Sequence, residues 1–133
     1  MHMREQLNSL TERITGGAAL TVHRELGPGM LEKAYESCLA FELADRGLNL
    51  ERQKTLPLSY RGMRLDSGYR IDLLVEDLVV VEVKSIERLD RVHSAQVLSY
   101  LRMLKLSVGL VINFNVQWLV RDGIRRIVND FPE

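Results

Sequence analysis

The sequence predicts a single domain, residues 1–133, in which helices cover one β-sheet in the order α-α-β-β-β-α-β-β. Three observations predict this α/β or α+β class. Apolar residues recur at helical spacing up to residue 46, the period becomes strand-like from residue 48, and one further helical stretch divides the later strands. The length of 133 residues and a hydrophobic share of 46% fit one core.

Three helices are expected. The first covers residues 4–26, where five apolar residues recur at helical spacing: Leu7, Leu10, Ile14, Ala18 and Val22. The sequence GPG at 27–29 ends it, because glycine suits a helix C-terminus and proline cannot continue the helix. The second covers residues 30–46 before Gly47, and the third covers residues 91–106 with Asp90 as its cap.

Strand-like alternation predicts five strands, over residues 48–60, 67–75, 78–84, 107–114 and 123–129. Pro57 marks the first as an edge or interrupted strand, because proline cannot donate to the ladder of hydrogen bonds. A turn is expected at RGM, residues 61–63.

The apolar faces of the second and third strands predict their register, because a slip by one residue would split the valine face. The match pairs Val75 with Val79, Leu73 with Val81, and Ile71 with Val83. The same register sets Asp72 directly opposite Glu82, and it requires a three-residue connection or a bulge near residues 76–78.

The stretch VVVEVKS (79–85) places Glu82 and Lys84 on one face of a strand whose composition predicts burial. Buried charges are costly unless they are paired or hold a metal. Two carboxylates across a strand pair repel each other, and a magnesium or manganese ion between them would turn repulsion into binding. Lys84 can hold a phosphate oxygen beside them. The pattern alone leaves equally open a structural salt bridge between Glu82 and Lys84.

Several motifs together resemble one nuclease family. Asp72 followed by Glu-Val-Lys at 82–84 is similar to the signature of the PD-(D/E)XK nuclease superfamily. GMLEKAY (29–35) fits the Gly-x-x-Glu-x-x-Tyr motif of the GxxExxY family within it, and QVLSY (96–100) fits a Gln-x-x-x-Tyr motif of RecB-like members. VGLVINF (108–114) and RRIV (125–128) follow in the family's order. The resemblance covers about residues 10–130. The superfamily's proline before the first aspartate is replaced by Ile71.

The resemblance implies a three-layer α/β/α restriction-endonuclease-like core with a mixed central sheet and helices on both faces. It implies that Asp72 and Glu82 bind Mg²⁺, or Mn²⁺, with the Val83 carbonyl. Glu32 would correspond to an acidic residue that an N-terminal helix lends to the metal. Its position in a first helical turn is also explained by the helix dipole alone.

The remaining site residues can be interpreted in functional or in structural terms. Lys84 would orient or activate the attacking water, with Gln96 and Tyr100 flanking the site on one helix face. Tyr100 would contact a phosphate or stack on a base, although the same two residues also fit a polar stripe. Tyr35 is a nucleic-acid contact or a core aromatic. Arg126 is a phosphate contact or a charge on a solvated edge strand.

Composition limits the partners. Eighteen basic and eighteen acidic residues give no net charge, so nucleic acid would have to bind at a local patch. The single Cys38 excludes an intrachain disulfide framework and a cysteine-based zinc cluster. With no long apolar run and no signal peptide, we expect no membrane partner and a cytoplasmic location.

The sequence therefore predicts a magnesium-dependent nuclease that hydrolyses phosphodiester bonds of DNA, or of RNA, with a homodimer as an expected assembly. The alternative is a non-catalytic module that keeps the nuclease fold and binds nucleic acid or a protein.

Overall fold

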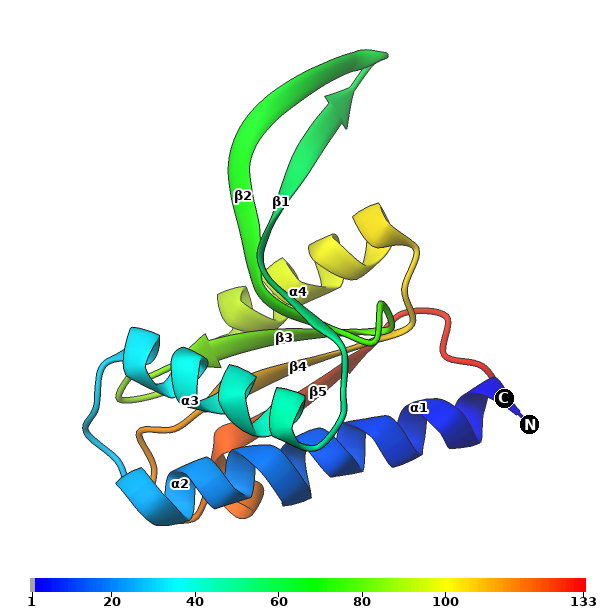
Figure 1. The fold of residues 1–133 in the computed structure, drawn as a ribbon. Helices are drawn as coiled ribbons and strands as arrows, with labels where there is room; N and C mark the ends of the chain where they lie inside the picture. The colour runs from blue at the N-terminus through cyan, green and yellow to red at the C-terminus, as the bar shows by residue number, and fades with distance from the viewer. Residues whose placement is uncertain (1) are drawn as a thin grey trace.

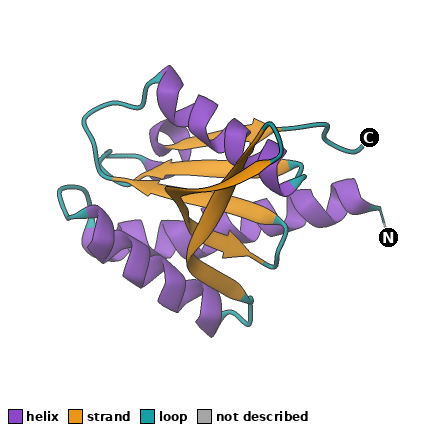
Figure 2. Cartoon of the chain, turned by 90° about the horizontal axis from the view of Figure 1, so that it is seen from above, coloured by secondary structure: helices purple, strands orange, loops and turns teal. Residues whose placement is uncertain are grey.

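The computed structural model describes residues 2–133 and places a five-stranded sheet between helices on both of its faces (Figures 1 and 2). The strand order is β1-β2-β3-β4-β5; β3 and β4 are parallel and the other neighbours are antiparallel. This mixed sheet with helical layers confirms the predicted α/β class and its three-layer form.

The predicted element order is confirmed, with small differences in the boundaries. The helices are α1 (Met3–Glu12), α2 (Leu20–Leu26), α3 (Glu32–Asp45) and α4 (Arg91–Leu104), with π-helical segments η1 (Arg13–Ala19) and η2 (Leu119–Gly123). The strands are β1 (Leu50–Tyr60), β2 (Met63–Val75), β3 (Val79–Lys84), β4 (Val108–Asn113) and β5 (Ile124–Val128). The expected turn at 61–63 is shorter, because Met63 already pairs with Tyr60.

The predicted first helix is continuous from α1 through η1 to α2, but its middle is π-helical. Gly16 and Gly17 lie in that middle segment, where they lower helical propensity. The hydroxyl of Thr15 donates to the carbonyl of Thr11, a side-chain bond that competes with regular helical bonding. Apolar spacing alone does not distinguish a π-helical turn from an α-helical one.

The two faces of the sheet carry separate apolar clusters. Val79, Val81 and Val83 of β3 pack in the cluster beneath α1, α2 and α3. Val80 packs in the cluster beneath α4. Since side chains alternate along a strand, Glu82 shares the α4 side of the sheet with Val80. The valine alternation therefore decides the layer to which Glu82 belongs.

The predicted hairpin register between β2 and β3 is confirmed over its first half. Val75 pairs with Val79 and Leu73 with Val81, and the connection is the expected three residues, Glu76 to Leu78. The predicted pairing of Ile71 with Val83 is wrong. Ile71 packs in the α4 cluster, whereas Val83 packs on the other face, because β2 is bent away from β3 in the residues that precede Leu73.

Beyond the bend, β1 and β2 continue together as a hairpin that projects from the body of the protein (Figure 1). Strand β1 forms the edge of the sheet, and its pairing with β2 is irregular between Leu56 and Leu58. This confirms the prediction that Pro57 marks an interrupted edge strand.

Gly123, where η2 meets β5, leaves no room for a side chain. A Cβ there would clash with the backbone carbonyl oxygen of Asn113 and lie 3.0 Å from Leu119 Cδ1. Gly123→Ala is therefore expected to lower the free energy of unfolding by about 2 kcal/mol, measured by urea denaturation. Gly16→Ala is the matched control, because its Cβ would meet nothing within 4 Å. Equal stability of the two variants would contradict this account.

Candidate metal and nucleic-acid site

Asp72 and Glu82 meet where β2 leaves β3, and their carboxylates replace the ladder of backbone hydrogen bonds. The backbone N–H of Asp72 donates to Oε2 of Glu82 at 2.7 Å. The backbone N–H of Val83 donates to Oδ2 of Asp72 at 2.8 Å. Each carboxylate thus accepts a backbone N–H of the other strand. The two acids face each other as predicted, but side-chain hydrogen bonds replace the regular pairing of the two strands.

Burial and mutual repulsion disfavour negative charge on this pair. Glu82 is 4% exposed, and burial together with the charge of Asp72 raises its pKa to about 8. Burial also raises the pKa of Asp72, against the opposing effect of the Val83 N–H bond. The positive charge of Lys84 lowers both pKa values. The site therefore favours a bound proton or a cation beside these acids.

A third acid reaches the pair from helix α3, and it is Glu36 instead of the predicted Glu32. Glu36 is 7% exposed, and its charge raises the pKa of both Asp72 and Glu82. Its position four residues after Glu32 puts both on one helix face, a spacing from which the sequence could have indicated it. Arg52 of β1 pairs with Glu36 at 3.1 Å.

Gln53 connects this third acid to the pair. Its side-chain nitrogen donates to Oε1 of Glu36 at 2.8 Å and to Oδ1 of Asp72 at 3.3 Å. Gln53 lies opposite the bend in β2 and adopts a left-handed backbone with φ of 52°, which is uncommon for a residue other than glycine. Strained backbone of this kind concentrates at functional sites. No local signal in the sequence indicated Gln53.

Glu32 does not converge with Asp72 and Glu82 as expected. It is exposed at the start of α3, and its carboxylate accepts the backbone N–H of Ser85 at 3.4 Å. Within residues 2–133, no group of three or more His, Cys, Asp or Glu side chains is arranged to hold one metal ion. The expectation of three acids around one cation is therefore corrected to a pair, Asp72 and Glu82.

Lys84, Gln96 and Tyr100 lie around the pair, as the motif spacing suggested. Lys84 ends β3, and its charge acts on both acids. Tyr100 of α4 is 3% exposed, and burial followed by the charge of Glu82 raises its pKa to about 12. Gln96, one turn earlier, interacts with the Tyr100 hydroxyl and lowers that pKa. Helix α4 thus supplies a polar edge to the acidic pair.

Tyr35 is a core residue, and its predicted contact with nucleic acid is corrected. The side chain is 0% exposed and stacks on Phe114 with ring centroids 4.6 Å apart. Its hydroxyl donates to the carbonyl of Gly27 and accepts the N–H of Met30 at 3.0 Å. The tyrosine of this motif therefore fastens the loop between α2 and α3.

Tyr35→Phe is expected to lower the free energy of unfolding by about 1–2 kcal/mol, because the backbone groups of Gly27 and Met30 lose their shared, partly buried hydrogen-bond partner. Thermal and urea denaturation measure the loss. Binding of oligonucleotides should stay at the wild-type level, since the ring is buried. A weaker affinity in a fully folded Tyr35→Phe protein would restore a direct role for this side chain.

Arg126 lies far from the acidic pair, on the other side of the sheet. It pairs with Leu110 of β4, whose side chain packs beneath α1–α3, and its guanidinium donates to Asn8 of α1 at 2.7 Å. The same guanidinium stacks on Phe131 at 4.5 Å from the ring centroid. The structure therefore does not bring Arg126 together with the other predicted site residues.

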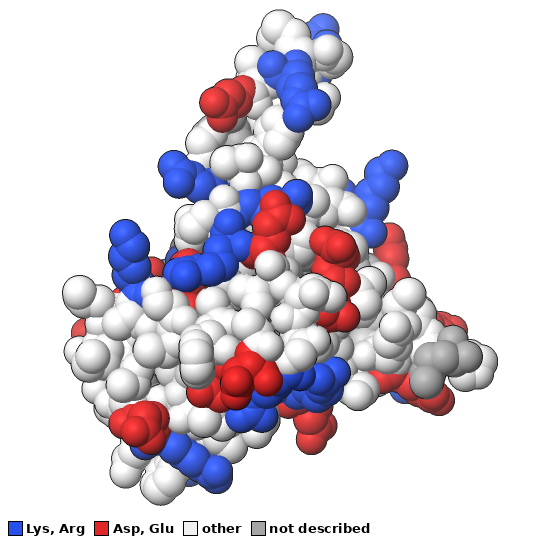
Figure 3. Space-filling view, in the orientation of Figure 1, with Lys and Arg blue, Asp and Glu red and all other residues white. Residues whose placement is uncertain are grey.

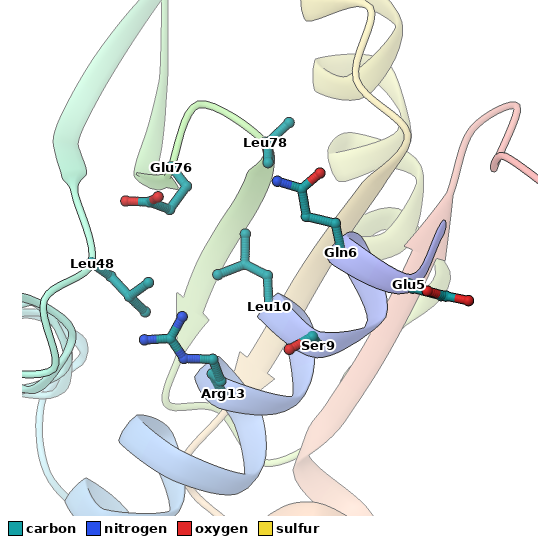
Figure 4. A pocket seen from close by; sticks show the side chains of 8 residues that line it. All are labelled: Glu5, Gln6, Ser9, Leu10, Arg13, Leu48, Glu76 and Leu78. Carbon is teal, nitrogen blue, oxygen red and sulfur yellow. The ribbon is translucent and has the colours of Figure 1, made fainter. Parts of the chain in front are cut away.

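Two surface hollows differ in whether they lie near the acidic pair. A cavity of about 360 Å³ lies between α1 and the β2–β3 turn, with Arg13, Leu10 and Glu76 on its wall (Figure 4). Glu76 already accepts the N–H of Asn49 there. This cavity contains neither member of the Asp72–Glu82 pair. A second hollow, of about 470 Å³, is lined by Gln96 and Tyr100 and thus adjoins the acidic pair.

The donor set at Asp72 and Glu82 fits a hard divalent cation. Both acids supply carboxylate oxygens, and among residues 2–133 no hydrogen bond reaches Oε1 of Glu82. Magnesium is commonly held by only one or two carboxylates, with water and phosphate oxygens completing its shell. The pair, with the neighbouring Val83 carbonyl, is therefore compatible with a magnesium or manganese ion.

Comparison with known proteins places the chain in one superfamily. A family model described as the PD-(D/E)XK nuclease superfamily matches residues 8–127. The chain belongs to the PD-(D/E)XK nuclease superfamily, whose members are typically nucleases and generally use divalent metals such as Mg²⁺. The match is at the level of the superfamily and does not reach the GxxExxY family. Neither the curated proteins nor the solved structures gave a significant match.

None of the helices within residues 2–133 has the length and apolar character needed to span a bilayer.

Proposed function

We propose that this protein is a metal-dependent nuclease whose catalytic site, formed by Asp72, Glu82 and Lys84, hydrolyses phosphodiester bonds. The observation that carries the proposal is the pair of a buried Glu82 and a half-buried Asp72, whose carboxylates accept backbone N–H groups of the partner strands, with a lysine beside them. A structural salt bridge between Glu82 and Lys84 explains the lysine less well, because no ion pair between them is present in residues 2–133.

Each residue has a role that its position supports. Asp72 and Glu82 would hold Mg²⁺ or Mn²⁺, which when bound polarises the phosphodiester and acidifies a water molecule. Lys84 would stabilise the negative charge that builds on the phosphoryl oxygens. Gln96 and Tyr100 would position the phosphate or the adjacent nucleotide from α4.

Glu36 and Gln53 would act as positioning residues. Gln53 holds one oxygen of Asp72 while bound to Glu36, so the orientation of the Asp72 carboxylate depends on both. Such partners behind a metal ligand typically change metal affinity or activity by about 10- to 100-fold when they are removed.

Hydrolysis of labelled DNA and RNA, single- and double-stranded, in the presence of Mg²⁺ or Mn²⁺ tests the proposal. Cleavage should require the metal and should be lost in Asp72→Asn and Glu82→Gln. Equal cleavage by wild type and both variants would assign the activity to a contaminant and refute the site.

The alternative is a module that keeps the nuclease fold and binds nucleic acid or protein without catalysis. The lack of a three-ligand acidic cluster within residues 2–133 favours it. Isothermal titration calorimetry discriminates between the two. If the protein is a nuclease, the wild type should bind Mn²⁺ with a measurable heat, and Asp72→Asn should show none. Absence of Mg²⁺ and Mn²⁺ binding to the wild type at millimolar concentration supports the non-catalytic module.

A further inference from the structure

A groove lies between the projecting β1–β2 hairpin and helix α4, and it includes Tyr100, on which the charges of Glu82 and Asp72 act. Its volume is about 470 Å³, and its lining is mostly apolar and aromatic. The hairpin supplies Leu58 and Tyr69, and α4 supplies one face of the helix: Val92, Ala95, Gln96, Ser99, Tyr100 and Met103. Because the charges of Glu82 and Asp72 act on Tyr100, a molecule lying in the groove would be close to the acidic pair.

The hairpin wall of this groove keeps large apolar side chains in contact with solvent. Leu58 lines the groove and pairs with Leu65, so the two share a face. Met63 lies two residues from Leu65 on that face, and the register with β1 sets Tyr60 opposite Met63. Tyr69 is 47% exposed and meets the ring of Tyr100 edge-on, with centroids 6.2 Å apart. On the facing helix, Val92 is 63% exposed. Contiguous exposed apolar surface of this kind typically marks a binding site.

The charge of the hairpin selects the type of occupant. Residues 54–70 carry four basic side chains and one acidic side chain, whereas the whole chain carries eighteen of each. Basic side chains, coloured blue, are prominent at the projecting end in Figure 3. Arg61, Arg64 and Arg70 are exposed and form no ion pair within residues 2–133. A polyanion would be attracted to this segment, while the like-charged hairpin of a second copy would be repelled.

We infer that the groove between the β1–β2 hairpin and α4 binds a single-stranded segment of nucleic acid, with Tyr69 as a stacking platform for a base. This inference rests on the proposed function, because it places the strand beside the same Asp72–Glu82 pair. Aromatic and apolar walls accept the faces of unpaired bases. Arg64 lies on the other face of the hairpin, so the basic side chains attract the phosphate backbone through the field of the whole hairpin. A duplex hides its base faces in the stack and presents phosphates and groove edges, which this apolar lining matches poorly.

The experiment is fluorescence anisotropy with a labelled oligonucleotide of mixed sequence, as a single strand and as its duplex, in EDTA so that metal-dependent cleavage is absent. The single strand should bind more tightly than the duplex. Tyr69→Ala should weaken single-strand binding about tenfold, and Tyr69→Phe should keep most of the affinity because the ring remains. Phe41→Ala is the matched control, since Phe41 is an exposed aromatic residue on α3, outside this groove.

A second variant tests the groove independently, in case Tyr69→Ala does not fold. Val92→Asp puts a negative charge on the helical wall of the groove at an exposed position, where it should also weaken single-strand binding. An acidic residue in the first turn of α4 favours that helix, so the fold should persist, as judged by thermal denaturation.

Distinct outcomes separate this inference from the proposed function. Equal affinity for single strand and duplex, with no loss of single-strand affinity in folded Tyr69→Ala and Val92→Asp, would overturn the assignment of this groove even if the wild type cleaves nucleic acid. Loss of strand binding in both variants would support the groove even if the wild type cleaves nothing with Mg²⁺ or Mn²⁺. A wild-type dimer in analytical ultracentrifugation that Tyr69→Ala dissociates, with oligonucleotide binding unchanged, would assign the groove to a second copy and overturn the inference.

Discussion

Asp72→Asn is expected to lower metal-dependent cleavage by about a thousandfold, the largest activity effect that we predict for this chain. The substitution removes one of two carboxylates from a site whose proposed cation has few other protein ligands. The fold should persist, because the asparagine carbonyl can still accept the N–H of Val83. Single-turnover cleavage with Mn²⁺, compared with the melting temperature of each protein, measures the two effects separately.

Two acids of helix α3, Glu36 and Glu32, provide matched controls for this result. Glu36→Gln removes a charge that acts on Asp72 and Glu82, and it weakens the contact that holds Gln53. We therefore expect a loss of about 10- to 100-fold. Glu32→Gln should lower activity much less, because Glu32 is exposed and its one hydrogen bond within residues 2–133 is with the N–H of Ser85. The reverse order would show that Glu32, and not Glu36, supports the metal site.

Glu82→Gln is expected to stabilise the metal-free protein at alkaline pH while it abolishes cleavage. In the folded protein the pKa of Glu82 is raised from 4.5 to about 8, so the folded state binds a proton that the unfolded state releases. The contribution of Glu82 to the free energy of unfolding is therefore greatest below about pH 4.5, and it is lost as the pH rises towards 8. The slope is at most about 1.4 kcal/mol per pH unit, and Asp72 contributes in the same direction.

Urea denaturation in EDTA from about pH 5 to about pH 9 measures this dependence. The wild type should lose stability across the range, and Glu82→Gln should lose less, because glutamine cannot ionise and can still accept the N–H of Asp72. Adding Mg²⁺ at alkaline pH should restore stability in the wild type only. Parallel profiles for the two proteins would mean that burial does not hold a proton on Glu82.

The hairpin of β2 and β3 illustrates how far alternation in the sequence could predict the site. Matching the valine faces predicted the register and the three-residue connection, and therefore brought Asp72 opposite Glu82. The same alternation failed at Ile71, because it assumes a straight strand. Here the strand bends, and the carboxylates take the hydrogen bonds that strand pairing would have used.

The N-terminal motif shows a different limit. Its glutamate and tyrosine were both expected at the site, but Glu32 lies at the helix start and Tyr35 lies in the core. Glu36, one turn further along the same helix face, reaches the acidic pair instead. Helical spacing identifies which residues share a face, whereas the docking of the helix on the sheet determines which turn lies over the site.

The sequence by itself determined the class of fold, the order of helices and strands, and the meeting of two acids with a lysine beside them. These features depend on the period of apolar residues and on neighbours along the chain, which a sequence displays directly. Only the tertiary structure decided that Glu36 and Gln53 support the pair and that a groove opens beside it. Those features depend on a strand bend and on helix packing, where contacts between distant residues outweigh local preference.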